Sequence, residues 1–250
     1  MSLPDIAPRD VWLLARKTLL AREKEFTRQK DALSADRRRM PMVAMEKDYE
    51  FEGPGGTVRL LDLFGEKRQL VLQHFMFDPA WDDGCSSCTA GCDEISDGLL
   101  EHLATRETSF AVVGRAPYAK IAAYKKKRGW TFPFVSSFGS DFNYDFNATI
   151  DESRAPLVIN FRTREDIAAP EGIKLRWALD QAQPFEMPGV SFFLRDANAV
   201  FHTNSTFARG TEACSDSYGL LDQTALGRQE NWEEPKGRAD DPHGPNPDFS

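Results

Sequence analysis

Hydrophobic positions near the N-terminus follow a helical period. Among Arg, Lys and Glu side chains, apolar residues recur at helical spacing: Trp12, Ala15, Leu19 and Phe26. This pattern predicts an amphipathic helix over residues 8–38. Pro41 ends it, because proline disfavours helical backbone at the preceding residue. Such an arm must pack on its own domain or on a second subunit, and we expect a homodimer through this helix.

The next segments have the patterns of strands. Between residues 49 and 63, Gly53-Pro54-Gly55-Gly56 separates two short runs rich in aromatic and β-branched residues, which predicts a hairpin. Residues 69–75 are apolar almost without interruption, as in a central strand covered on both faces. Residues 109–114 have the pattern of the next strand. These segments predict a sheet with a buried centre.

One helix is predicted after each of these two central strands. The first follows residues 69–75 and carries one apolar face with steps of four and three: Cys88, Cys92, Ile95, Leu99 and Leu103. The second begins at Pro117, points Ile121 and Tyr124 inward, and ends in the basic run 125–128, which is favourable to the helix dipole. Strand, helix, strand and helix in this order predict a right-handed crossover and a parallel pair.

The regular pattern is interrupted over about residues 137–185, which we interpret as an insertion. It resumes as two strands, 190–194 and 200–203, joined by a tight turn and followed by a helix near 211–221. The expected organisation is an N-terminal helical arm (1–40), one α/β domain (41–228) and an acidic tail rich in Pro and Gly (229–250).

Composition limits the classes of function. The 250 residues are 41% hydrophobic and 28% charged, and no apolar run approaches the roughly 20 residues of a membrane-spanning helix. A net charge of -8 argues against nucleic acid as a main partner, because phosphate binding needs clustered Lys and Arg. Residues 1–8 lack the basic start and apolar stretch of a secretory signal, so a cytoplasmic location is expected.

Cys85 and Cys88 are the most informative residues for chemistry. They form a Cys-x-x-Cys motif between an apolar strand and a helix. Four cysteines in the chain are too few for a disulfide-stapled scaffold, and in a reducing compartment a close pair is typically catalytic or metal-binding. A metal would need two further ligands. We expect no metal and no other cofactor.

The assembled pattern resembles the thioredoxin fold, and in particular a bacterial family of thioredoxin-like proteins without an assigned reaction. The resemblance covers roughly residues 40–230 and rests on these segments: Phe75-Met76-Phe77 running into Trp81 and Gly84 to Cys88, Arg115-Ala116-Pro117, Gly129-Trp130 with Phe132-Pro133, the loop 139–146, and Phe201-His202-Thr203 followed by Ala208-Arg209-Gly210. It implies an α/β thioredoxin-like sandwich. The mixed central sheet would have flanking helices, an N-terminal helical extension and an insertion before the last two core strands.

The chain departs from two patterns known on this fold. Thioredoxins carry a cis-proline immediately before the third core strand, and the nearest candidate, Pro188, comes two residues early. Peroxiredoxins carry a threonine three residues before their peroxidatic cysteine, and Asp82 occupies that position before Cys85. The standard peroxiredoxin site is therefore absent.

The two cysteines of the motif are expected to have different chemical roles. Cys85, at the expected helix start, would be the nucleophile, because unpaired backbone N–H groups and the helix dipole stabilise a thiolate. Cys88, one turn into the helix, would resolve the mixed disulfide. Asp82 and Asp83 are expected to raise the pKa of the Cys85 thiol, since neighbouring carboxylates disfavour a thiolate.

Other residues are open to two interpretations. Cys92 fits a core position better than a metal ligand, and Cys214 is an isolated thiol or a second resolving cysteine. His74 and His202 are core histidines or site residues. The remaining expected neighbours of the site are Trp81, which with Trp130 could frame a docking partner, and Arg209, which could polarise an anionic substrate.

These observations support one main hypothesis and two alternatives. The main one is a thiol–disulfide oxidoreductase that acts on a protein or small-molecule disulfide and is restored by an external thiol reductant. The first alternative is a peroxide-reducing enzyme that uses Cys85. The second is a non-catalytic thioredoxin-like binding module. Neither nucleic acid nor a membrane is expected as a partner.

Overall fold

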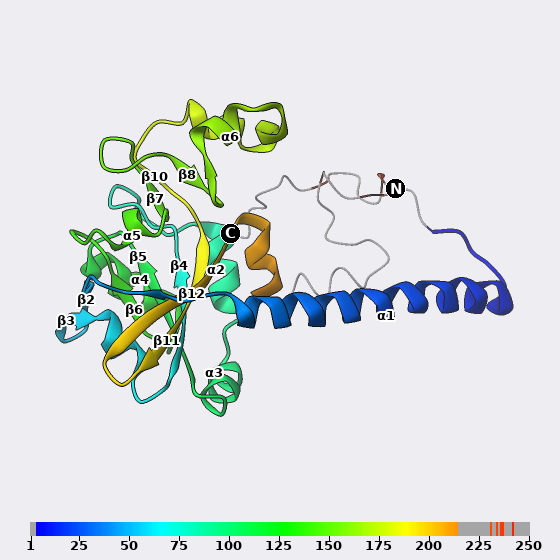
Figure 1. The fold of residues 1–250 in the computed structure, drawn as a ribbon, viewed down its shortest axis with the longest axis horizontal. Helices are drawn as coiled ribbons and strands as arrows, with labels where there is room; N and C mark the ends of the chain where they lie inside the picture. Colours follow the sequence, from blue (N-terminus) through cyan, green and yellow to red (C-terminus); the bar gives the residue numbers. More distant parts are fainter. Residues whose placement is uncertain (1–3, 215–230, 232–233, 235, 238–241, 243–250) are drawn as a thin grey trace. The chain divides into compact units, whose positions relative to one another are not determined.

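The computed structural model describes residues 4–214, together with residues 231, 234, 236, 237 and 242 (Figure 1). The chain up to Met42 belongs to one compact unit, and Val43 to Cys214 belong to a second unit. None of the described helices is long and apolar enough to cross a membrane.

The N-terminal unit contains the helix α1 (Arg9–Arg39), close to the predicted range of 8–38. It ends in three arginines, which are favourable to the negative end of the helix dipole. Met40, the residue before Pro41, is in an extended conformation with ψ of 142°, as the clash with a following proline requires. None of the residues of α1 is buried.

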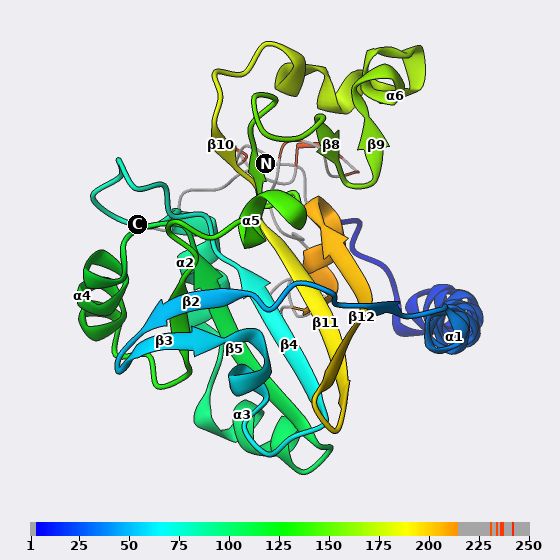
Figure 2. The ribbon, with the colours of Figure 1, turned by 60° about the vertical axis from the view of Figure 1, so that its left-hand side comes forward.

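An eight-stranded mixed sheet forms the centre of the second unit. Its strands lie side by side in this order: β1 (Val43–Ala44), β12 (Ala199–Phe207), β11 (Gly189–Asp196), β4 (Gln69–His74), β5 (Thr108–Gly114), β6 (Phe134–Ser136), β2 (Glu50–Gly53) and β3 (Gly56–Arg59). Figure 2 shows β11, β4 and β5 at the centre of this sheet.

The connections between these strands confirm the thioredoxin-like sandwich. β4 and β5 are parallel and are joined by helices α2 (Ser86–Asp93) and α3 (Asp97–Ala104). β5 and β6 are also parallel and are joined by α4 (Tyr118–Arg128). On the other side of β4, β11 pairs antiparallel with it and forms a hairpin with β12.

Two apolar clusters cover the two faces of the sheet, as the continuous apolar pattern of β4 predicts. On the first face, Leu70 and Leu72 pack with aromatic rings that include Phe142, Phe146 and Phe193. On the second face, the cluster contains the cysteines of α2 and these buried residues: Phe75, Phe77, Phe110, Val112, Ala116, Ile121, Tyr124, Trp130, Phe132 and Phe134. The inward positions predicted for Ile121 and Tyr124 are confirmed.

The predicted insertion is only partly separate from this core. Helix α5 (Phe142–Asp145) and Phe146 fall within the predicted insertion of about 137–185, but they pack on the first face of the sheet. The rest forms a small lobe with its own apolar cluster around Leu157 and Ile167. Its elements are β7 (Thr149–Ile150), β8 (Val158–Ile159), β9 (Arg162–Thr163), α6 (Arg164–Ala168), the 3-10 helix η2 (Pro170–Leu179) and β10 (Phe185–Glu186). Both ribbon views show this lobe beyond one end of the sheet (Figures 1 and 2).

Several other elements match the sequence pattern, and some do not. The hairpin is formed by β2 and β3, followed by the 3-10 helix η1 (Leu60–Phe64). The short strands β1 and β6 were not predicted. The C-terminal helix expected near 211–221 is represented by the 3-10 helix η3 (Ala208–Cys214), and the rest of that range lies outside the described residues, as does most of the tail 229–250.

The single helix predicted through Cys88 and Leu103 is in fact two helices. α2 ends at Asp93, and Ser96 caps α3 by accepting a hydrogen bond from the backbone N–H of Leu99 at 3.1 Å. A serine hydroxyl in this position satisfies one of the unpaired N–H groups at a helix start. The apolar period therefore continues across a break in the backbone helix.

Ser96→Ala tests whether this cap supports the break. The substitution removes the acceptor for the Leu99 N–H and should lower the free energy of unfolding by about 1 kcal/mol. Urea unfolding followed by far-ultraviolet circular dichroism measures the change. Unchanged stability would show that the break does not depend on the serine cap.

Candidate functional site: the Cys85–Cys88 dithiol

Cys85 lies at the junction of the central strand and its helix. A loop follows β4, and Cys85 is the residue that precedes the first turn of α2. Its N–H donates to the carbonyl oxygen of Met76 at 3.0 Å, and its own carbonyl accepts from the N–H of Thr89 at 2.9 Å. A Cβ atom at Gly84 would lie 2.3 Å from the Phe75 ring, so only glycine fits this close approach. The backbone thus fixes the cysteine against the core.

The Cys85 thiol is partly exposed and acidic. Its pKa falls from the ordinary 9.0 to about 6, mainly because the Cys88 side chain donates a hydrogen bond to its sulfur. The backbone N–H groups of Cys88 and Ser87 also lower this pKa, and burial opposes them. Unpaired N–H groups at a helix N-terminus stabilise an anion in this way. Near neutral pH the Cys85 side chain is therefore mainly a thiolate.

Cys88 has the opposite character. It is 6% exposed, and its pKa lies well above the ordinary value because its proton is held in the hydrogen bond to Cys85 and because it is buried. The two sulfur atoms are not joined in a disulfide. Cys85 is thus the more acidic and more accessible thiol of the pair, and Cys88 is the protected one.

The other two cysteines do not complete a metal site. Cys92 is fully buried in the second apolar cluster, and burial raises its pKa. Cys214 is exposed at the end of η3. Among the described residues, no group of three or more His, Cys, Asp or Glu side chains could hold a metal ion.

Lysines of α4 hold the loop before Cys85. Lys120 Nζ donates to the carbonyl oxygens of Pro79 and Trp81, at 2.9 and 2.8 Å. Lys127 Nζ pairs with Asp83 at 3.0 Å, so a cation balances one of the two carboxylates expected to disfavour the thiolate. Trp81 is 41% exposed. Its contact with a docking partner stays a prediction.

A second set of contacts joins α2 to α4. Thr89 Oγ1 lies 2.8 Å from the carbonyl oxygen of Cys85 and 2.8 Å from the Tyr124 hydroxyl. At the other end of α2, Asp93 accepts from the indole N–H of Trp130 at 2.8 Å and pairs with Arg128. Trp130 is therefore a buried core residue that fixes the position of α2.

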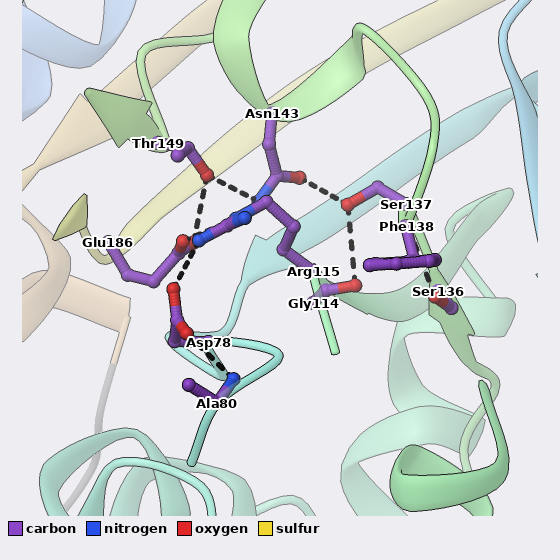
Figure 3. A network of polar contacts seen from close by, with 10 residues as sticks. All are labelled: Asp78, Ala80, Gly114, Arg115, Ser136, Ser137, Phe138, Asn143, Thr149 and Glu186. Carbon is purple, nitrogen blue, oxygen red and sulfur yellow. Dashed lines mark hydrogen bonds and ion pairs between the residues drawn. The ribbon is translucent and has the colours of Figure 1, made fainter. Parts of the chain in front are cut away.

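An ionic network lies beyond the ends of the parallel strands (Figure 3). Arg115, directly after β5, pairs with Asp78 and donates from Nε to Glu186 of β10 at 2.6 Å. Asp78 lies in the segment 75–84 between β4 and Cys85, which we call the redox loop. Glu186 is 1% exposed at its side chain and accepts from Thr149 Oγ1 at 2.9 Å. Burial raises the pKa of Glu186, and Arg115 opposes that shift. One guanidinium therefore ties the redox loop to the inserted lobe.

The sequence pointed to Arg115 only as part of a resemblance, and it did not suggest Glu186 or Thr89. Glu186 lies 71 positions from Arg115, so no local pattern could pair them. A glutamate between apolar residues, at Phe185 and Met187, is the one signal that it is buried.

His74 and His202 lie on the face of the sheet opposite the cysteines. His74 stacks on Phe142 with ring centroids 5.6 Å apart, and its Nε2 is 2.7 Å from Ser191 Oγ. Ser205 links Ser191 to His202, with 2.7 Å to each. The structure therefore does not bring His202 to the thiol pair, and His74 is a core histidine.

Pro188 and Arg209 are the remaining predicted neighbours. The cis peptide bond in the described chain is Gln183–Pro184, and Pro188 is not in the cis form. Arg209 lies in η3, which follows β12, and its Nε donates to Glu212 at 2.9 Å. β12 runs parallel to β4, so the C-terminal ends of both strands lie at the same end of the sheet. η3 therefore begins at the end of the sheet where the redox loop begins.

The chain belongs to a known family. Residues 1–241 match the model of DUF899, described as a bacterial protein of unknown function. No curated protein matches the chain.

Several solved structures are similar to the chain. Peroxidoxin BcpB from Mycobacterium tuberculosis is 13% identical, with 70% of this chain and 90% of that chain covered and a TM-score of 0.45. A cysteine-to-serine mutant of PrxQ from Xylella fastidiosa is 14% identical, with 68% and 87% covered and a TM-score of 0.40. The bacterioferritin comigratory protein from Xanthomonas campestris is 13% identical, with 67% and 88% covered and a TM-score of 0.39. At such low identities and scores, the fold assignment rests on the strand order and crossovers of this chain.

Arg115→Ala tests the ionic network. It leaves the buried Glu186 carboxylate without its cation and should lower the free energy of unfolding by about 3 kcal/mol. Adding Glu186→Gln should recover part of this loss, because the unpaired charge is removed. The exposed pair of Lys127 gives a matched control, and Lys127→Ala should change stability by less than about 1 kcal/mol. Equal effects of Arg115→Ala and Lys127→Ala in urea unfolding would contradict the assigned role.

His74 predicts an acid dependence of stability. Burial lowers its pKa from 6.5 to about 3, and the charge of His202 acts in the same direction. Between these values the unfolded chain binds a proton that the folded chain does not, so stability is lost as pH falls through this window. From pH 6.5 to 5 the loss from this residue is about 2 kcal/mol. His74→Gln should remove that part of the pH dependence, and the exposed His102→Gln controls for the loss of one histidine. Identical acid profiles for wild type and His74→Gln would contradict the prediction.

Proposed function

We propose that this member of the DUF899 family is a thiol–disulfide oxidoreductase in which Cys85 attacks a disulfide and Cys88 resolves the intermediate. The observation that carries the proposal is the contrast between the two thiols. Cys85 is partly exposed with a pKa of about 6, whereas Cys88 is buried with a raised pKa. A dithiol enzyme needs this division of roles, because one sulfur must react with the substrate and the other must wait for the mixed disulfide.

The reaction balances without a cofactor. The Cys85 thiolate attacks one sulfur of a substrate disulfide, forms a mixed disulfide and releases the other substrate sulfur as a thiolate. Cys88 then loses its proton to the departing thiolate and attacks Cys85 Sγ. This breaks the bond between Cys85 and the substrate, and the second substrate sulfur leaves as a thiolate that takes a proton from water. The products are two substrate thiols and a Cys85–Cys88 disulfide, and an external dithiol reduces this disulfide. The substrate gains two electrons, and the enzyme pair loses two.

The surroundings of Cys85 favour a substrate that docks as a surface. The exposed Trp81 and the partly exposed sulfur lie in one loop region. Aromatic rings provide large apolar contact area at modest entropic cost. A disulfide on a protein or peptide is therefore the substrate class that we assign.

Peroxide reduction is the nearest alternative chemistry. An acidic thiolate also attacks a peroxide, in which case Cys85 becomes a sulfenic acid and one water or alcohol leaves. Cys88 would then condense with the sulfenic acid, release water and form the same disulfide. The pKa contrast serves both reactions, so the two are separated by assay.

Cysteine variants test the proposed roles. Reduction of insulin disulfides, driven by dithiothreitol, should be lost in Cys85→Ser, because the nucleophile is absent. Cys88→Ser should lose turnover and accumulate a mixed disulfide on Cys85, which mass spectrometry of the intact protein detects. Cys214→Ser removes an exposed thiol outside the Cys-x-x-Cys motif and is the matched control, with activity expected within about twofold of wild type.

Three outcomes would count against the proposal. Equal residual insulin reduction in Cys85→Ser and Cys88→Ser would show that the pair is not the reaction centre. Consumption of hydrogen peroxide by Cys85, without disulfide reduction, would favour the peroxide alternative. No response in either assay would favour a binding module on the same fold.

A further inference from the structure

Four residues of the redox loop form a hydrogen-bonded turn. The Trp81 N–H donates to the carbonyl oxygen of Asp78 at 3.0 Å, and the Ala80 N–H donates to the Asp78 carboxylate at 2.8 Å. Aspartate at the first position and proline, here Pro79, at the second favour such a β-turn. The turn ends on Trp81, four residues before Cys85.

Lys120 of α4 binds two carbonyl oxygens of this turn. Its Nζ donates to Pro79 at 2.9 Å and to Trp81 at 2.8 Å. Hydrogen bonds from a charged ammonium group are stronger than those between neutral groups. One side chain from another element therefore holds the backbone on both sides of Ala80.

A second cation holds the start of the turn. Figure 3 shows the Asp78 carboxylate between Arg115 and the N–H of Ala80. Arg115 also pairs with the buried Glu186, so it serves the lobe as well as the turn. The hydrogen bonds that Lys120 makes within the described part of the chain go to the turn alone. Lys120 is thus the contact that can be removed without disturbing the lobe.

The side chain that this turn carries is not covered in the same way. Trp81 is 41% exposed, whereas Trp130 in the core is 9% exposed. The polar groups of the turn are therefore bound by the protein while part of the indole faces solvent. A residue whose backbone is already ordered loses less freedom when it binds. Tryptophan is also among the residues that most often dominate a binding energy.

We propose that Lys120 is a positioning residue that holds Trp81 for a polypeptide disulfide. The inference rests on the proposed function, because the polypeptide is the substrate that Cys85 attacks. Chain that flanks the substrate disulfide passes the redox loop and buries the indole, whereas a small disulfide has no such chain. Lys120 therefore sets how well the enzyme distinguishes the two classes of disulfide.

The chemistry of the thiol pair does not depend on Lys120. The groups that lower the pKa of Cys85 are Cys88 and Ser87. Both lie in the first turn of α2, and the contacts of Lys120 lie at the other end of the redox loop. Removal of Lys120 should therefore change substrate binding and leave the pKa of the Cys85 thiol as it is.

Kinetics with two disulfides test this separation. Lys120→Met keeps the aliphatic stem and removes the ammonium group. The KM for insulin should rise about fivefold with kcat unchanged, because only binding is weakened. The rate constant for oxidation of the reduced enzyme by hydroxyethyl disulfide should stay within about twofold of wild type. Lys126→Met is the matched control, since it removes the same charge from an exposed position of α4, and both quantities should keep their wild-type values.

A double-mutant cycle tests whether Lys120 acts through Trp81. Trp81→Ala should raise the KM for insulin at least about tenfold. Adding Lys120→Met to Trp81→Ala should then change this KM by less than about twofold, because effects that pass through one contact are not additive. Effects that multiply to about fiftyfold would show that Lys120 does not act through the tryptophan.

Hydrogen exchange followed by nuclear magnetic resonance gives a readout that needs no activity. The amide of Trp81 should exchange at least about tenfold faster in Lys120→Met than in wild type, because the turn opens more often. In Lys126→Met it should exchange at the wild-type rate.

Two further results would overturn the positioning role. Equal losses with insulin and with hydroxyethyl disulfide would show that Lys120 acts on the thiol pair or on the fold. Unchanged exchange of the Trp81 amide in Lys120→Met would show that the lysine does not hold the turn. A wild-type protein that reduces neither disulfide would instead overturn the proposed function, and the exchange rates would still decide whether Lys120 holds the turn.

Discussion

The hydrogen bond from the Cys88 thiol to the Cys85 sulfur is the interaction on which the rest of the site depends. It requires Cys88 to lie inside the core and Cys85 to lie at the helix start, within reach of the first backbone N–H groups. Spacing of three along α2 places both sulfurs on the same side of the first turn. The burial of one thiol therefore stabilises the anionic form of the other, and neither effect arises without the packing of α2 on the sheet.

The surrounding fold holds that packing from several directions. Thr89, Tyr124 and Trp130 join α2 to the second apolar cluster and to α4. Lys120 holds the backbone of the loop before Cys85, and Arg115 ties Asp78 of the same loop to Glu186 in the inserted lobe. A charge pair that is mostly buried costs desolvation, but it specifies one geometry when every partner is satisfied. The lobe thus contributes to the position of the redox loop.

Much of this arrangement could be predicted from the sequence, because local patterns carry it. The continuous apolar run of β4 and the inward Ile121 and Tyr124 of α4 follow from period alone. The break between α2 and α3 could not be predicted from the spacing of apolar residues, since that spacing continues across the break. His202 was expected near the thiols, but strand register places it on the other face beside Phe146. Register and contacts distant in sequence, such as Arg115 with Glu186, are set by tertiary packing, which no local pattern reports.

The pH dependence of Cys85 alkylation by iodoacetamide tests the role of Cys88 most directly. It is measured in Cys214→Ser, because the exposed Cys214 would compete for the reagent whereas Cys88 and Cys92 are buried. The alkylation rate should rise with a midpoint near pH 6. The midpoint should be higher when Cys88→Ala removes the hydrogen-bond donor. An ordinary thiol midpoint near 9.0 in both proteins would contradict the claim that Cys88 stabilises the Cys85 thiolate.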